Sequence, residues 1–302
     1  MEDYDLKEVH VADYAFLKGY FSLRHTGTCE NVITDAYLWK IYYRTKYFLT
    51  ETGLCWLYKT DSEVFSSIPL SKPEHLRENV EALEKYYHDV LGQKLVMHLV
   101  DEEAVSLLAL PEDRYEVTAE RMYFDYVYDA EALRKLSGKK YHKKKNHVNA
   151  FMKEYEGRYQ CRRLAGYDIE EILDFIHKWH ADRPSDDPYH RDEYEIKGIE
   201  YVIRNCRLIK YEMFGVYIDG RLEAFSLGTY DPVMKMAVIH VEKANAEIRG
   251  LYPFINQQFL CMAFPEAELV NREDDMGLAG LRKAKESYHP VELVKKYTVR
   301  ER

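Results

Sequence analysis

The chain has 302 residues, of which 46% are hydrophobic and 31% charged, and its formal net charge is −9 at pH 7. This length suggests two folding units or one large one, with enough apolar residues for a sizeable core. The sequence shows no apolar run approaching the roughly 18–20 residues of a membrane-spanning helix, and its net negative charge argues against a surface built for bulk nucleic-acid binding.

The first half of the chain alternates between strand and helix patterns. Residues 41–59 predict a β-hairpin, because two β-rich runs flank Thr52-Gly53. A long helix is expected over 130–155, interrupted near Ser137-Gly138, because glycine disfavours a helix interior. Strands are also expected over 62–70, 94–100 and 115–128, with helices over 72–91 and 102–110.

The second half gives a clearer order of elements. Its strongest local signal is Asp219-Gly220, which predicts a hairpin turn. A strand and two helices are expected before this hairpin, and alternating strands and helices after it. The expected ranges are strand 158–164, helices 168–181 and 193–208, hairpin strands 212–217 and 221–228, strand 235–242, helix 250–264, strand 268–272, helix 277–287 and strand 291–297.

This order of elements resembles the GNAT fold of N-acetyltransferases, and the first half shows a less complete version of it. The resemblance implies an α/β (α+β) protein of two tandem GNAT-like units, each a mixed, mostly antiparallel sheet flanked by helices. The expected division is 1–129 for the first unit, 130–156 for a connecting basic helix and 157–302 for the second unit. A single α/β domain with an amino-terminal extension is the alternative.

The segment HVEKANAEIRGLYPFINQQF (240–259) places a strand, a loop and a helix in succession. A helix amino terminus presents unpaired N–H groups that suit a phosphate, and Gly250 would let the backbone approach a ligand. The GNAT resemblance implies that the pyrophosphate of acyl-CoA binds here, although the loop has only one glycine. The expected cofactor contacts are Arg249, Gly250, Leu251 and Tyr252; alternatively, Gly250 only permits the turn.

His240 and Glu242 lie two residues apart on the expected strand. Strict alternation would place both side chains on one face, with Met236 and Val238. A carboxylate or imidazole there could accept the proton of an attacking amine. The alternatives are a salt-bridged Glu242 and a hydrogen-bonded core histidine.

A second polar segment, NREDDMGLAGLRKAKESYHPVELVKKY (271–297), follows a strand and contains a helix. Polar groups at the carboxyl end of a strand mark the usual ligand-binding edge of open α/β sheets. Asn271, Arg272, Asp274 and Lys285 are therefore candidate substrate contacts. The GNAT resemblance implies that Tyr288 protonates the leaving group, although chance placement is an alternative in a chain with 27 tyrosines.

The segment SGKKYHKKKNHVNAF (137–151) concentrates positive charge in an acidic chain. On a helix, Lys140, Lys143 and Lys144 share one side with His147, and Lys139 lies further round. Lysine ammonium groups bind phosphates as point charges, so this segment is a candidate site for the phosphates of CoA or the backbone of tRNA. A solvated charged face is the alternative.

Five scattered cysteines and no CxxC pair predict thiols in a reducing cytoplasm, without a disulfide framework or zinc site. The amino-terminal MEDYDLKEVH lacks the regions of a signal peptide, which agrees with a cytoplasmic location. HKWH (177–180) places two histidines three residues apart, which is only part of a ligand set, so we expect no metal.

Together, the segments GKKYHKKKNHVNAF, HVEKANAEIRGLYPFINQQF and NREDDMGLAGLRKAKESYHPVEL resemble the phosphatidylglycerol lysyltransferase C-terminal-domain-like family. This family is related to the Fem-type aminoacyl transferases. The resemblance implies transfer of an acyl group from acyl-CoA or aminoacyl-tRNA to an amine or hydroxyl acceptor. The implied acceptor is a small molecule or a peptide, and tRNA is a further candidate partner. The lipid-modifying lysyltransferases carry a large membrane-embedded part that this sequence does not show, so lipid modification is less expected, but peripheral contact with a membrane stays open.

Two non-catalytic interpretations also remain. Residues 134–153 could bind RNA, with an affinity that falls steeply as salt rises. Alternatively, the chain could be an inactive GNAT-like protein that binds a small metabolite.

Overall fold

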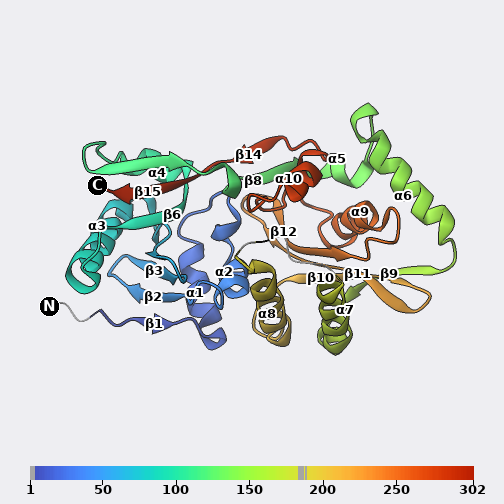
Figure 1. Ribbon diagram of the computed structural model, residues 1–302, viewed down its shortest axis with the longest axis horizontal. Helices are drawn as coiled ribbons and strands as arrows, with labels where there is room; N and C mark the ends of the chain where they lie inside the picture. The colour runs from blue at the N-terminus through green and yellow to red at the C-terminus, as the bar shows by residue number, and fades with distance from the viewer. Residues whose placement is uncertain (1–3, 183–186, 188) are drawn as a thin grey trace. The chain divides into compact units, whose positions relative to one another are not determined.

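The computed structural model describes residues 4–182, 187 and 189–302 (Figure 1). It consists of two compact units, one formed by residues up to Phe124 together with Val294–Arg302, and one formed by Asp125–Leu293. No helix among the described residues is long and apolar enough to cross a membrane.

These units differ from the expected division in three places. Residues 125–129, expected in the first unit, form a strand of the second. The basic helix does not connect the units but belongs to the second, because its Val148 and Phe151 join that unit's core. The last strand, β15 (Lys296–Glu301), belongs to the first unit, because it pairs with two strands of that unit. Short-range patterns locate strands but do not identify a pairing partner far away in the sequence.

The first unit contains a five-stranded and a three-stranded antiparallel sheet. The expected hairpin forms as β2 and β3, but residues 41–44 are turns instead of strand. The five-stranded sheet runs β1-β2-β3-β4 with β5 on β3, and the smaller sheet runs β6-β15-β7. The elements are β1 (Lys7–Glu8), α1 (Tyr14–Phe21), α2 (Ile33–Trp39), β2 (Lys46–Leu49), β3 (Gly53–Lys59), β4 (Val64–Phe65), β5 (Leu70–Ser71), α3 (Leu76–Tyr86), β6 (Val96–Asp101), α4 (Glu102–Leu108), β7 (Tyr115–Ala119) and β15.

The second unit is a seven-stranded sheet in the order β14-β8-β13-β12-β11-β10-β9. The pair β12–β13 is parallel, whereas β8–β13, β9–β10, β10–β11 and β11–β12 are antiparallel. The elements are β8 (Asp125–Asp129), α5 (Ala130–Lys135), α6 (His142–Glu154), β9 (Tyr159–Leu164), α7 (Ile169–Ala181), α8 (Arg191–Arg204), β10 (Glu212–Ile218), β11 (Arg221–Asp231), β12 (Met236–Ala244), α9 (Leu251–Ala263), β13 (Leu269–Asn271), α10 (Ala279–Glu286) and β14 (Glu292–Val294).

The sheet of the second unit has helices on both faces, with α5, α6 and α9 on one side and α7 and α8 on the other (Figure 1). The expected break of the long helix is present, since α5 ends at Lys135 and α6 begins at His142. Phe151, Phe254 and Phe259 are almost completely buried between the sheet and its helices. Burial of large aromatic side chains provides much of the driving force that holds these helices on the sheet.

Candidate active site

The parallel strands β12 and β13 pair only where they begin. Their three paired positions end at Val238 and Asn271, after which β13 stops and β12 continues to Ala244. The final residues of β12 therefore have no strand beside them on that edge. Glu242 lies in this unpaired part of β12, and Arg272 directly follows the end of β13.

Glu242 forms an ion pair with Arg272 where the two strands separate. Its Oε1 accepts a hydrogen bond from Arg272 Nη2 at 2.9 Å, and its Oε2 accepts one from Asn256 Nδ2 of α9 at 2.8 Å. The two charged side chains are only 10% and 12% exposed. Burial makes such a pair costly unless its hydrogen bonds are well formed, so the geometry of the carboxylate is tightly determined.

Two buried polar atoms, one in this ion pair and one next to it, have no hydrogen-bond partner among the residues that the structure describes. They are Nη1 of Arg272 and Oγ of Ser226, which is fully buried. Ser226 lies directly opposite Glu242 in the β11–β12 register. Buried polar groups are nearly always satisfied in folded proteins, so each exception needs an explanation, such as a catalytic role or a bound water or ion.

Tyr288 and Lys144 complete the cluster. The ammonium of Lys144 lies 3.8 Å from the centre of the Tyr288 ring, and the Arg272 guanidinium lies 4.6 Å from it. Burial raises the pKa of Tyr288, so its phenol is protonated at neutral pH. Burial, followed by the positive charge of Arg272, lowers the pKa of Lys144 to about 8. The cluster thus combines a proton donor, a carboxylate and two cations.

His240 lies on the other face of the sheet, contrary to the expected alternation. The register between β11 and β12 shifts at this residue, so the alternation of faces changes there. Its ring is bonded to Thr229, whereas Glu242 contacts α9. Burial lowers the pKa of His240 to about 3. The ring is therefore neutral, with Nδ1 2.8 Å from Glu273 Oε1, and it supports the loop after β13.

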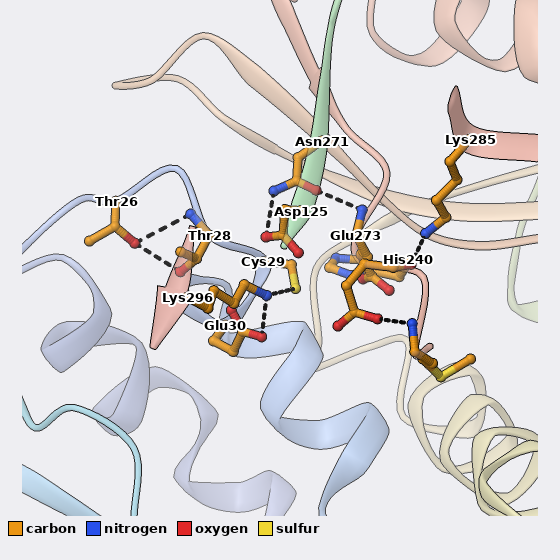
Figure 2. Close-up of polar contacts among 12 residues, drawn as sticks. Thr26, Thr28, Cys29, Glu30, Asp125, His240, Asn271, Glu273, Lys285 and Lys296 are labelled. Atoms are coloured by element: carbon orange, nitrogen blue, oxygen red, sulfur yellow. Dashed lines mark hydrogen bonds and ion pairs between the residues drawn. The ribbon is translucent and has the colours of Figure 1, made fainter. Parts of the chain in front are cut away.

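That loop is fixed by side chains proposed above as substrate contacts. Figure 2 shows Asn271 donating to Asp125 at 2.9 Å and accepting from the backbone N–H of Glu273 at 2.6 Å. Lys285, 8% exposed, donates to the backbone carbonyls of Arg272 and Asp274. Asn271 and Lys285 thus hold the segment that presents Arg272. Asp274 caps the same loop by accepting from the N–H of Met276.

The basic segment and the start of α9 come together. Gly250 precedes α9 with a φ of 86°, and a Cβ there would collide with the backbone carbonyl oxygen of His147. Burial and the charges of Arg249, Lys143 and Lys144 lower the pKa of His147. Gly250 therefore permits the close packing of α6, and cations from α6 and the α9 loop gather beside it.

The other expected anion contacts divide by exposure. Lys139, Lys140, Lys143 and Arg249 are exposed, whereas Lys144 is half-buried. Leu251 is part of the hydrophobic core, and the Tyr252 hydroxyl lies 3.2 Å from the indole nitrogen of Trp179. Of these expected contacts, a large polyanion can therefore reach the three exposed lysines and Arg249.

Sequence reasoning missed Asn256 and Ser226. Asn256 is a polar residue within the apolar row of α9 and is only 2% exposed, which is a signal that the sequence carries. Ser226 gives no comparable signal, because its place opposite Glu242 depends on the shifted register of β11 and β12.

Comparison with known proteins agrees with this architecture. Residues 21–300 match the family described as phosphatidylglycerol lysyltransferase, C-terminal. An uncharacterized protein of Mycoplasmoides gallisepticum is 26% identical over 179 residues, which span 58% of this chain and 56% of that protein. The chain therefore spans about half the length of this curated relative.

Solved structures show the same fold. A conserved protein of unknown function from Bacteroides thetaiotaomicron has a TM-score of 0.86 at 24% identity, covering 99% of this chain and 100% of that one. L-PGS from Bacillus licheniformis has a TM-score of 0.67 at 12% identity, covering 95% and 91%. A tandem GNAT protein from the clavulanic acid biosynthesis pathway has a TM-score of 0.51 at 9% identity, covering 99% and 98%. The expected tandem GNAT-like fold is confirmed.

Proposed function

This chain belongs to the phosphatidylglycerol lysyltransferase C-terminal family, and we propose that its second unit transfers an acyl or aminoacyl group to an amine or hydroxyl acceptor. The observation that carries this proposal is the buried cluster at the divergence of β12 and β13. Nη1 of Arg272 and Oγ of Ser226 have no partner there among the described residues, while Glu242 and Tyr288 lie beside them.

In the proposed reaction, the acceptor nitrogen or oxygen attacks the carbonyl carbon of the donor and forms the new C–N or C–O bond. Glu242 accepts the proton, because its two hydrogen bonds use only part of the acceptor capacity of a carboxylate. Arg272 and Lys144 stabilise the negative charge that develops on the carbonyl oxygen. The bond to the leaving sulfur or oxygen then breaks, and the protonated phenol of Tyr288 supplies its proton.

The exposed lysines of the basic segment favour a donor with many phosphates. Lys139, Lys140 and Lys143 are exposed, whereas Lys144 is half-buried against the ring of Tyr288. One segment therefore provides both exposed cations for a polyanion and a cation beside the proposed proton donor. This arrangement supports aminoacyl-tRNA over acyl-CoA. None of the five cysteines, all of which the structure describes, is in a disulfide, which supports a cytoplasmic location where both donors occur.

Single-turnover transfer assays with acetyl-CoA and aminoacyl-tRNA as donors, and small amines and peptides as acceptors, test the proposal. We expect transfer from one donor class, and a loss of about 10²-fold or more in Glu242→Gln, the usual contribution of a positioned base. Glu247→Gln is the matched control, since Glu247 is exposed on the following loop. If tRNA is the donor, its binding will weaken steeply with salt. Wild-type rates in Glu242→Gln would contradict the assigned role.

A further inference from the structure

The first unit contains a cavity that is separate from the cluster around Glu242. It lies among α1, α2, β3 and β4, and about 50 Å³ of it is open to the centres of water molecules. A single water needs only about 10–15 Å³ on this measure, so the cavity accommodates a larger group. All of its lining residues belong to the first unit.

Seven of the lining side chains are aromatic. The rings of Tyr43, Tyr58 and Phe65 contact one another, with centroids 5.2–5.6 Å apart. Trp56 stacks on Tyr58 at 6.3 Å, and Trp39 lies 6.4 Å from Tyr43. Aromatic faces carry partial negative charge and attract organic cations within about 6 Å.

Carboxylates outnumber cations in the wall of the cavity. Arg24 is matched by Asp101, whose two oxygens accept at 2.8 and 2.6 Å. Figure 2 shows the buried Lys296 paired with Glu30, with Nζ and Oε1 2.5 Å apart. Lys296 itself does not line the cavity; the lining has three carboxylates, Glu30, Asp35 and Asp101, and Arg24 is the one Lys or Arg among its described residues.

Two further observations indicate an acidic, ligand-accepting interior. Burial raises the pKa of Tyr58, and the charges of Asp35 and Glu30 raise it further, so their negative potential reaches this ring. Thr45 lines the cavity and is only 5% exposed, yet its hydroxyl has no hydrogen-bond partner among the residues described. The hydroxyls of Thr26 and Thr28, which bond each other at 3.0 Å (Figure 2), add polar atoms to the lining.

We propose that this cavity binds a small organic cation, a primary or quaternary ammonium group, between the aromatic rings and Asp35. The rings supply the cation–π surface, and the unpartnered Thr45 hydroxyl accepts a hydrogen bond from a primary ammonium or from a water bound with it. This site does not depend on the proposed transfer reaction, because it is built from the first unit alone.

Tryptophan fluorescence gives a direct test, because two of the chain's three tryptophans, Trp39 and Trp56, line the cavity. The probes are tetramethylammonium, butylammonium and neutral tert-butanol at constant ionic strength, titrated into the full chain and into Trp179→Phe, which lacks the third tryptophan. We expect saturable changes with both cations and at least tenfold weaker binding of tert-butanol. Equal binding of tert-butanol, or no saturable change with either cation, overturns the proposal.

Substitutions of residues that line the cavity test whether the cation binds there. Tyr43→Leu and Asp35→Asn should each weaken cation binding about tenfold, the factor that corresponds to about 1.4 kcal/mol. Tyr167→Leu and Asp61→Asn are the matched controls, since both residues are exposed outside the cavity, and should leave the affinity unchanged. Circular dichroism identifies folded variants; if Tyr43→Leu does not fold, Asp35→Asn decides. Unchanged affinity in a folded pocket variant contradicts the proposal.

Discussion

Lys144 differs from the other lysines of α6 because its ammonium is half-buried over Tyr288 and close to Arg272. Burial and this neighbouring charge lower its pKa to about 8 from an ordinary 10.5. Between these two values the unfolded chain holds a proton that the native chain has released, so this residue makes stability rise with pH. Below pH 8 both states are protonated, and the cost of the buried charge is present in full.

We therefore predict that wild-type protein gains stability relative to Lys144→Met as pH rises from 8 to 10. Urea unfolding at several pH values measures this difference. Lys145→Met is the control, because Lys145 is exposed on the same helix. A constant difference between wild type and Lys144→Met over this range would show that Lys144 has an ordinary pKa.

At the scale of elements, the packing of α6 on the start of α9 depends on Gly250. Gly250→Ala adds two costs: a Cβ at a φ of 86° and a collision with the His147 carbonyl. Gly220→Ala is the matched control, since its φ is 79° and nothing lies within 4 Å of the added Cβ. We expect about 1–2 kcal/mol of destabilisation for Gly220→Ala, and about 1–3 kcal/mol more for Gly250→Ala. Equal losses of unfolding free energy would contradict this account of the packing.

The elements also show what a sequence can predict. Periodicity and turn residues locate nearly every strand and helix of the second unit, because these signals are local. The separation of His240 from Glu242 is not predictable, because the register shift depends on pairing with β11. The sequence predicts Lys144 as a phosphate contact on a basic helix face, but its burial is not predictable, because it depends on packing against Tyr288, far away in sequence. The cavity of the first unit escapes prediction for the same reason, since its rings come from α1, α2, β3, β4 and the turn that contains Tyr43.

At the scale of the whole molecule, the chain returns to its first unit at the end. β15 lies between β6 and β7, so residues nearly 200 positions apart complete one sheet. The tandem architecture gives each unit its own candidate site: an aromatic, acidic cavity in the first and a buried charged cluster in the second. The chemistry is assigned to the second unit, where Tyr288 is the proposed proton donor.

The rate constant of a single transfer turnover in Tyr288→Phe tests this assignment most directly. The substitution keeps the ring over which Lys144 and Arg272 lie and removes only the hydroxyl. Because the proposed proton donor is lost, the rate constant should fall by about 10²-fold or more. Tyr167→Phe, altered at an exposed tyrosine of the same unit, should keep the wild-type rate. A wild-type rate in folded Tyr288→Phe would contradict the proposal that Tyr288 protonates the leaving group.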